Sequence, residues 1–200
     1  MMIADLIRAT RTVRRYREDL AIGDAVLRGL VDLARLGGSA GNRQPLRYTI
    51  VTDQRLREQV FPCLGWAGYL RDWPGPAEGE RPAAYIVCLL DRDRSGAAEK
   101  HAHIDLGIAT QNLLLGAAEQ GIYGCRIASV APAIKRVLGV DERYGFLLVV
   151  ALGYPAEQVV LEEGGGDDPV RYWRDKNGVH HVPKRRLDDV LLLPGKTAGE

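Results

Sequence analysis

Two segments of nearly continuous apolar residues, 83–90 and 146–152, place the strongest constraint on the fold of this chain. Each is short and rich in β-branched or aliphatic side chains, as expected of a strand. A strand that is apolar on both of its sides is typical of one buried on both faces of a sheet. A third segment, residues 46–52, combines β-branched and aromatic side chains and predicts another strand.

The spacing of apolar residues also predicts two helices. Residues 24–36 place apolar side chains at intervals of three and four, and a Gly-Gly pair then supplies a stop signal. The longer pattern covers residues 102–120, is apolar nearly all round and ends before a glycine, which predicts a central buried helix. Residues 39–45 then form a loop between the first helix and a strand.

The net charge of the chain is close to zero, so the protein as a whole does not attract a highly charged partner. The chain has 27 Lys and Arg against 26 Asp and Glu, so neither nucleic acid nor an acidic membrane surface is expected as a partner. Any anion site must therefore be local. The longest apolar run is too short to span a bilayer, and the first residues break their own apolar run early, unlike a signal peptide.

Cysteine usage fits a reducing cytoplasm. Cys63, Cys88 and Cys125 are odd in number and widely spaced, and they form no C-x-x-C pair. Neither a disulfide framework nor a zinc site is therefore expected.

A chain of 200 residues with 46% hydrophobic content suits one domain with a substantial core. We expect a cytoplasmic protein.

The C-terminal part has a different composition. Residues 162–168 are acidic and glycine-rich, which is typical of a linker between a body, residues 1–161, and a C-terminal arm, residues 169–200. The arm is too apolar for disorder and too small for a core of its own. It should pack either on the body or on a partner subunit. His180 and His181 are expected at the surface.

Two separate segments offer groups suited to a bound phosphate-bearing cofactor. Arg11 and Arg14 are three residues apart, so a helical turn or a tight loop would aim both to one side, with the Thr12 hydroxyl between them. Guanidinium groups bind phosphate oxygens through fixed pairs of donors. A solvated basic surface is the alternative. For Lys184 and Arg186, taken alone, a solvated surface is the better interpretation.

Asn42 and Gln44 are the second such group. They are two residues apart, so in an extended loop both side chains would point to the same side. Each amide presents both a donor and an acceptor, which suits the edge of a heteroaromatic ring such as a flavin's. The alternative is a structural role in which these side chains cap backbone groups of the loop.

Other motifs are weaker. His101, His103 and Asp105 could suggest a metal ion, but we expect no metal site because their spacing does not bring the three side chains together. No G-x-G-x-x-G follows a strand and no G-x-S-x-G is present, so neither a Rossmann dinucleotide site nor a nucleophile elbow is supported.

A set of short patterns, in the same order along the chain, resembles the FMN-dependent nitroreductase family. No single pattern is specific, but together they extend over almost the whole chain. They are R-[ST]-x-R-x-[FY] at residues 11–16, S-x-x-N-x-Q-P at residues 39–45, D-x-G-x-x-x-Q-N-L at residues 105–113, the loop at residues 121–129, L-G-Y-P at residues 152–155, and K-x-R at residues 184–186, followed by an acidic, apolar helix.

The resemblance implies an α+β fold with a mixed sheet flanked by helices and a C-terminal arm exchanged in a homodimer. It also implies FMN at the dimer interface. Around the phosphate and ribityl end it would place Arg11, Thr12, Arg14, Lys184 and Arg186. Asn42 and Gln44 would address the flavin and the ribityl hydroxyls, and the main chain of Ala128 and Ser129 would approach flavin N5.

The implied activity is transfer of two electrons from NADH or NADPH to an electron-poor small molecule such as a nitroaromatic, a quinone or an enone. Because the cofactor performs this chemistry, no catalytic acid or base is predicted. Two alternatives stay open. One is a family relative with different flavin chemistry, namely dehalogenation, dehydrogenation or flavin breakdown, and the other is a non-catalytic flavin-binding protein.

The chain departs from the family pattern at several positions. Thr10 stands where members often carry Arg or Lys, Leu46 stands where many carry an aromatic residue, and the loop that ends in Ala128 and Ser129 lacks the acidic residue of some members. These departures leave the nicotinamide preference and the substrate class open. The aromatic segment at residues 64–76 could line the substrate face, or it could be a helix end packed on the core.

Overall fold

The computed structural model describes residues 2–95, 99–164, 170–192 and 194. The chain divides into two compact units, Met1–Ala156 and Glu157–Glu200. The first unit therefore ends before the predicted body boundary at residue 161. Each unit is described by itself below.

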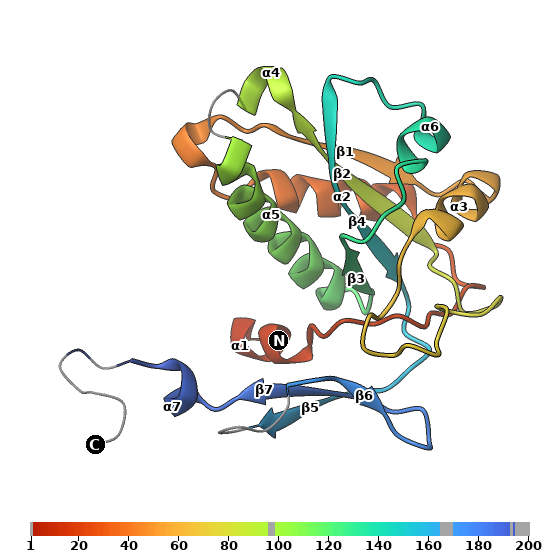
Figure 1. Cartoon of the computed structure of the whole chain (residues 1–200), viewed down its shortest axis with the longest axis vertical. Coiled ribbons are helices and arrows are strands. Elements are labelled where there is room, and N and C mark those ends of the chain that lie inside the picture. Colours follow the sequence, from red (N-terminus) through yellow and green to blue (C-terminus); the bar gives the residue numbers. More distant parts are fainter. Residues whose placement is uncertain (1, 96–98, 165–169, 193, 195–200) are drawn as a thin grey trace. The chain divides into compact units, whose positions relative to one another are not determined.

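The first unit contains a four-stranded sheet (Figure 1). Its strands are β1 (Leu46–Val51), β2 (Ala84–Asp91), β3 (Tyr123–Ile127) and β4 (Tyr144–Gly153), in the order β1-β2-β4-β3. All three neighbouring pairs of strands are antiparallel. The resemblance implied a mixed sheet, and this one is purely antiparallel. The three predicted strands are confirmed. β3 lies in a segment that was expected to be a loop.

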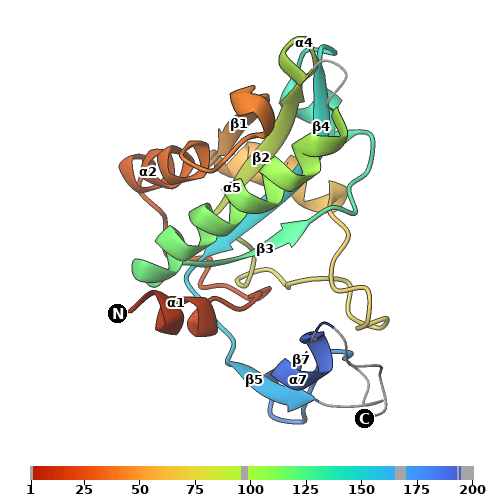
Figure 2. The ribbon, with the colours of Figure 1, turned by 90° about the vertical axis from the view of Figure 1, so that its left-hand side faces the viewer.

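Both faces of the central strands are covered, as their continuous apolar sequence predicts. Along β2, Ile86 and Cys88 face a core with α2 (Asp24–Arg35) and α5 (Glu99–Glu119). Their neighbours Tyr85, Val87 and Leu89 face a second core with α3 (Gln54–Val60) and α6 (Ile134–Leu138). Figures 1 and 2 show the two helix layers on opposite sides of the sheet. Successive side chains of a strand point to opposite faces, so one strand serves two cores.

The helix α5 is less enclosed than its sequence predicted. It runs from Glu99 to Glu119 and packs against α2, as Figure 2 shows. In its N-terminal half, however, Ile104 is 62% exposed and Ile108 is 40% exposed. The helix is therefore buried on its sheet side and carries an exposed apolar strip on the other. The described helices include none long and apolar enough to cross a membrane.

The basic segment at residues 11–16 is extended and not a helical turn, which corrects the prediction. It follows α1 (Ile3–Ala9) and lies beside β3, where Thr12 forms a parallel bridge with Gly124. Tyr16 is fully buried, and its hydroxyl donates to the Val13 carbonyl at 2.6 Å. Tyr16 also forms an antiparallel bridge with Pro155. The aromatic residue of the motif is thus an internal anchor for the segment.

The shorter elements of the first unit connect these layers. They are η1 (Ala40–Asn42), η2 (Phe61–Cys63) and α4 (Arg92–Ser95).

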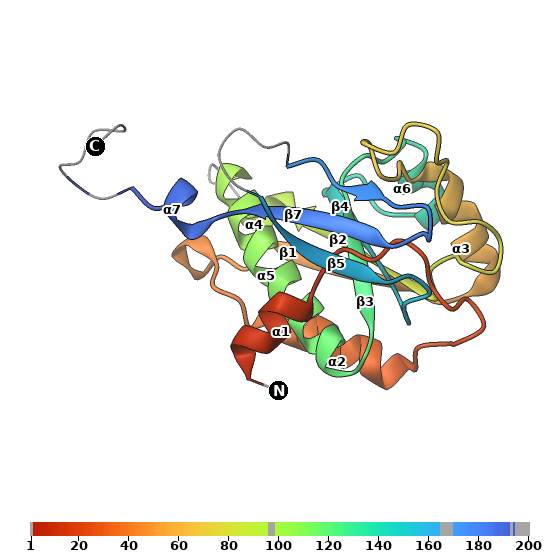
Figure 3. The ribbon, with the colours of Figure 1, turned by 90° about the horizontal axis from the view of Figure 1, so that it is seen from below.

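The second unit contains a three-stranded sheet of β5 (Val159–Gly164), β6 (Trp173–Arg174) and β7 (His180–Arg185), followed by α7 (Leu187–Val190). β5 and β7 pair in parallel and run side by side in Figure 3, while β6 and β7 are antiparallel. Residues 162–164 of the predicted linker are thus the end of a strand, and residues 165–168 lie outside the described residues.

Replacement of Gly153 should destabilise the first unit. A Cβ at this position would lie 2.7 Å from Cδ1 of the buried Tyr16 ring, which cannot move away. We expect Gly153→Ala to lower the free energy of unfolding by about 1–3 kcal/mol, the usual cost of overpacking. Urea unfolding followed by circular dichroism measures it.

Gly29→Ala is the matched control. Gly29 is an exposed residue in the middle of α2, and nothing lies within 4 Å of a Cβ added there. We expect Gly29→Ala to raise the free energy of unfolding by about 0.5–1 kcal/mol. Equal effects of the two substitutions would contradict the close contact between Gly153 and Tyr16.

Candidate cofactor site

Arg11 follows Thr10, the C-terminal cap of α1, and is half-buried. Its Nη2 donates to the Ile7 carbonyl at 2.6 Å, so the guanidinium also caps the last turn of the helix. Burial lowers the pKa of Arg11 because the charged form loses hydration. Its Nε is buried, and among the described residues neither a hydrogen-bond acceptor for this atom nor a carboxylate partner for the guanidinium is present. Such a cation is suited to an external anion.

The neighbouring cation Arg15 has a different role. Its guanidinium binds both carboxylate oxygens of Glu80, with Nε 2.7 Å from Oε2. The Glu80 carbonyl also accepts from the Tyr16 amide at 3.0 Å. This pair anchors the extended segment to the rest of the unit. The structure therefore separates Arg15, which is neutralised internally, from Arg11, which is not.

A buried carboxylate shapes the loop that carries the two amides. Asp105 on α5 is 4% exposed and accepts from the Ser39 hydroxyl at 2.6 Å and from the Ala40 amide at 3.0 Å. The Ser39 hydroxyl in turn accepts from the backbone N–H of Gln44 at 3.0 Å. Two of these hydrogen bonds tie the start of the loop to α5, and the third ties the end of the loop to its start. Asp105 is therefore an internal anchor, which explains the acid in an otherwise apolar helix.

The loop is a tight turn and not extended, which corrects the prediction for Asn42 and Gln44. Gly41, Asn42 and Gln44 have φ of 58°, 53° and 50°, in the left-handed region that residues other than glycine seldom adopt. The two amide side chains nevertheless lie together, because Gln44 Nε2 donates to Asn42 Oδ1 at 3.0 Å. Both residues are exposed. A strained, internally braced loop with exposed amides is typical of a functional site.

Ala128 and Ser129 follow β3 and are exposed. The Ser129 carbonyl accepts from the Gly65 amide at 2.8 Å, and a Cβ on Gly65 would lie 2.5 Å from Ser129 Oγ. The start of the aromatic segment thus supports this loop from one side. Within that segment Trp66 packs on Phe61 with ring centroids 5.8 Å apart, so Trp66 has a structural role.

Lys184 and Arg186 belong to the second unit, and their grouping with Arg11 stays a prediction. Lys184 is exposed and lies opposite Glu163 in the parallel register of β5 and β7. Arg186 Nε lies 3.1 Å from Glu163 Oε1, and both side chains are largely exposed. An exposed ion pair of this kind contributes little to stability, so Arg186 can exchange this partner for another anion.

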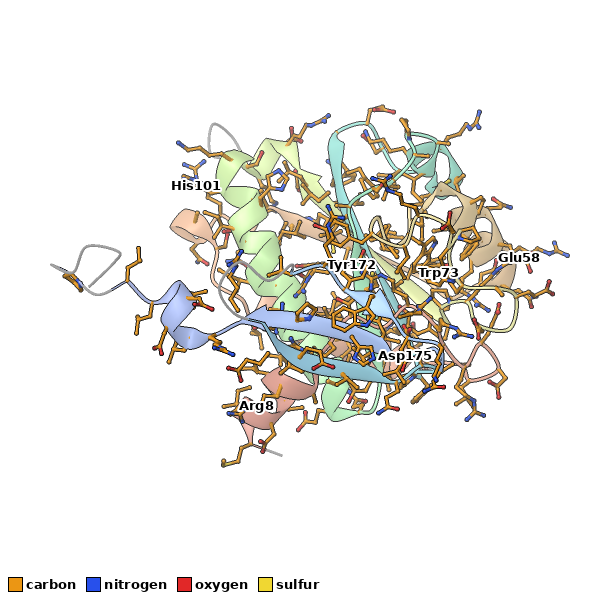
Figure 4. The ribbon with its side chains drawn as sticks, turned by 60° about the horizontal axis from the view of Figure 1, so that its bottom comes forward. Arg8, Glu58, Trp73, His101, Tyr172 and Asp175 are labelled. Carbon is orange, nitrogen blue, oxygen red and sulfur yellow. The ribbon has the colours of Figure 1, made fainter. Side chains whose placement is uncertain are left out.

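The histidines near these cations are not simple surface residues, which corrects the prediction. His180 is buried, and its ring lies 5.2 Å from that of Tyr172. His181 stacks on Trp173 at 4.9 Å and contacts Glu162 through Nδ1 at 2.7 Å. Figure 4 shows Tyr172 in this unit, together with Asp175 in the turn between β6 and β7.

The loop at residues 39–45, which carries Asn42 and Gln44, is called the amide loop below. It contributes to the wall of a cavity of about 310 Å³. The cavity walls come from α2, from residues 37–39 and 44–48 and from α5. The polar residues among them are Arg35, Ser39, Gln44, Arg47, Tyr48 and Asp105. No cluster of three His, Cys, Asp or Glu side chains placed to hold a metal ion occurs within the described ranges. His101, which the sequence grouped with His103 and Asp105, lies in the first turn of α5 (Figure 4).

Sequence reasoning did not assign a role to two functional residues. Asp105 was part of a motif, and its signal was a single acid among buried apolar residues. Glu80 had no sequence signal, because its partner Arg15 is 65 residues away.

The donor set fits a flavin mononucleotide. Arg11 supplies a half-buried cation without an internal counterion, Thr12 supplies a hydroxyl, and Arg14 follows on the same extended segment. The exposed amides of Asn42 and Gln44 supply donors and acceptors of the kind that a heteroaromatic edge requires.

The comparisons with known proteins agree with the fold. The model of the nitroreductase family matches residues 7–68 and 71–154. A relative from Archaeoglobus fulgidus, provisionally named NADH dehydrogenase/NAD(P)H nitroreductase, is 29% identical over 180 residues, covering 86% of this chain and 96% of the relative.

Solved structures have the same fold. A nitroreductase family protein from Streptococcus pneumoniae superposes with a TM-score of 0.66 at 16% identity, covering 84% of this chain and 96% of that one. A provisionally named nitroreductase from Desulfovibrio desulfuricans in complex with FMN has a TM-score of 0.64 at 25% identity, covering 78% and 87%. The α+β architecture and the family match define an oxidoreductase of the nitroreductase type. The chain belongs to the nitroreductase family.

Removal of the Asp105 carboxylate should loosen the amide loop. Asp105→Ala loses two hydrogen bonds to a buried charged group, each worth about 1.5–3 kcal/mol, and leaves the Ser39 hydroxyl without its acceptor. We expect faster amide hydrogen exchange at residues 39–44 and a lower midpoint of unfolding.

Asp32→Ala is the control for this variant, because Asp32 forms an exposed ion pair with Arg35 on the neighbouring helix α2. It should change stability by less than about 1 kcal/mol. Unchanged exchange at residues 39–44 in Asp105→Ala would show that other contacts hold the loop.

Proposed function

We propose that this protein passes two electrons from NAD(P)H to an electron-poor small molecule, such as a nitroaromatic, a quinone or an enone. As a member of the nitroreductase family it is an oxidoreductase with FMN as cofactor and NADH or NADPH as donor. When bound, FMN supplies the two-electron chemistry. The observation that carries the proposal is the half-buried Arg11 guanidinium without an internal counterion, in the same unit as a braced loop of exposed amides.

The protein side chains bind and orient the cofactor. Arg11 and Arg14 hold the phosphate end, with the Thr12 hydroxyl on the ribityl chain. In a protein of net charge +1, a local group of cations is what allows a dianion to bind.

The amide loop and the loop after β3 hold the ring. Asn42 and Gln44 are already oriented by their mutual hydrogen bond, which reduces the entropy lost on binding. Ala128 and Ser129 are exposed residues, and the Ser129 carbonyl accepts from the Gly65 amide. Their peptide N–H groups can therefore serve the ring edge without a particular side chain. Such preorganised dipoles stabilise charge that develops during the reaction.

The visible spectrum of the purified protein tests the proposal. We expect a yellow protein whose acid-released cofactor is FMN, and we expect NADH or NADPH to bleach the flavin absorbance without oxygen. Reoxidation by a nitroaromatic or a quinone, followed by product analysis, then separates reduction from dehalogenation or dehydrogenation. A protein that stays colourless with excess FMN contradicts the proposal, and one that binds FMN without reacting with either nucleotide is a binding protein.

We also propose that Lys184 and Arg186 complete the phosphate site. Each charge-assisted contact contributes about 1.5–3 kcal/mol, so loss of one should weaken FMN binding by roughly tenfold to a hundredfold. Lys184→Gln/Arg186→Gln should therefore bind FMN much more weakly, while riboflavin, which lacks the phosphate, should bind equally to both proteins. Titrations of the apoproteins at fixed salt measure this. Equal FMN affinities would identify a solvated basic surface.

A homodimer is the proposed assembly. Leu36 at the end of α2 and Ile104 and Ile108 on α5 form exposed apolar surface of the kind that a second copy of the chain would cover. Sedimentation should give about twice the 22.0 kDa chain mass at micromolar concentration. Ile104→Asp should favour the monomer and weaken FMN binding, whereas the exposed substitution Arg28→Gln should change neither. A flavin-loaded monomer would overturn this assembly.

A further inference from the structure

Three arginines of the first unit lie together where the amide loop meets the end of β2. They form the arginine cluster, which consists of Arg43, Arg47 and Arg94. The Asp91 amide donates to the Pro45 carbonyl at 2.8 Å, which holds the end of the loop against the end of the strand. Arg43 Nη1 donates to the Ser95 carbonyl of α4 at 3.1 Å, so the middle of the loop is held there as well.

The arginine cluster carries more positive charge than its buried carboxylate neutralises. Arg47 Nη2 lies 3.0 Å and Arg94 Nε lies 3.5 Å from the same oxygen of the buried Asp91, so two cations share one negative charge. Among the described residues, Arg43 has only a neutral backbone carbonyl as acceptor. Asp93, the other acid of α4, is exposed and forms no ion pair within the described ranges. The cluster is therefore a local region of excess positive charge.

Two of the three guanidinium groups are accessible to a ligand. The Arg94 side chain is 61% exposed, and Arg43 is an exposed residue. Arg47 is more enclosed and also donates to the Gln44 and Leu46 carbonyls at 3.1 Å and 2.8 Å, so it fixes the path of the chain. An exposed ion pair contributes little to stability, so Arg94 can exchange Asp91 for an external anion.

The position of the cluster beside the amide loop points to the electron donor as the ligand. Arg43 stands between Asn42 and Gln44, the two amides that are proposed to meet the flavin, but its guanidinium bonds to α4. The FMN phosphate is assigned above to other cations, so the cluster is left for a different anion. NADPH carries a phosphate on its adenosine ribose that NADH lacks, and guanidinium groups bind such a terminal phosphate through paired hydrogen bonds.

We propose that Arg43 and Arg94 bind the 2′-phosphate of NADPH and make NADPH the preferred electron donor. This inference rests on the proposed function and selects between its two donors. The net charge of the chain is only +1, so discrimination for an additional phosphate requires a local group of cations. NADH offers the cluster no terminal phosphate and gains nothing from it.

Reduction of the FMN-loaded protein by each nucleotide, without oxygen, tests this selection. We expect half of the maximal reduction rate at roughly a tenfold lower concentration of NADPH than of NADH. Arg43→Met/Arg94→Met should raise that concentration about tenfold for NADPH, with the maximal rate and the NADH values unchanged. The matched control is Arg28→Met, which removes an exposed cation on α2 and should change neither nucleotide.

The other outcomes of this experiment are distinct. Equal weakening of both nucleotides would mean that the cluster meets the pyrophosphate, which they share, and no weakening of either would mean a solvated basic surface. Both results overturn the proposal. Bound FMN that neither nucleotide reduces in the wild type would instead refute the proposed function, and nucleotide binding then decides whether the phosphate site exists.

Calorimetric titration of the FMN-loaded protein with nucleotide fragments measures that binding without turnover. We expect adenosine 2′,5′-bisphosphate to bind the wild type about tenfold more tightly than adenosine 5′-monophosphate, and this difference should shrink at high salt. It should vanish in Arg43→Met/Arg94→Met. Arg43→Lys/Arg94→Lys keeps both charges and should keep most of the difference, and it also serves if the Met variant does not fold. Equal binding of the two fragments by the wild type overturns the proposal.

Discussion

Burial of β2 and β4 on both faces is the constraint on which the rest of the structure depends. Residues 84–91 of β2 are all buried, so helices must cover the sheet on each side. With both faces occupied, polar groups can gather only at the edge strands and at the loops that leave them. The first unit follows this pattern, because the basic segment lies along β3 and the amide loop leads into β1.

Two kinds of arginine occur at these edges, and they differ in whether a carboxylate of the described residues neutralises them. Arg15 and Arg47 are neutralised by Glu80 and Asp91, and they fix the path of the chain. Arg11 is half-buried and is held by a neutral acceptor, the Ile7 carbonyl of α1. Burial without neutralisation costs free energy in the unliganded protein, and a bound anion offsets that cost.

The sequence predicted the parts of the fold that local patterns determine. The strands β1, β2 and β4 and the helices α2 and α5 follow directly from apolar spacing. β3 was missed because the sequence YGCRI contains a glycine and an arginine and carries little strand signal. The end of β5 was interpreted as a linker because Glu162, Glu163 and Gly164 are polar, yet parallel pairing with β7 makes them a strand. Such pairing is non-local, and so is the burial of His180.

The site illustrates the same limit at the level of single residues. Motif order was enough to select Arg11, Asn42 and Gln44, but not the conformation that presents them. The amides lie together in a turn with positive φ. Asp105 binds Ser39 and Ala40 at the start of this turn, and the Gln44 backbone N–H at its other end donates to the Ser39 hydroxyl. A motif thus predicts which groups meet a ligand, whereas the turn that carries the amides is anchored by a buried carboxylate more than 60 residues away. Residues that position others carry weak sequence signals, because any local pattern around them also fits a core helix.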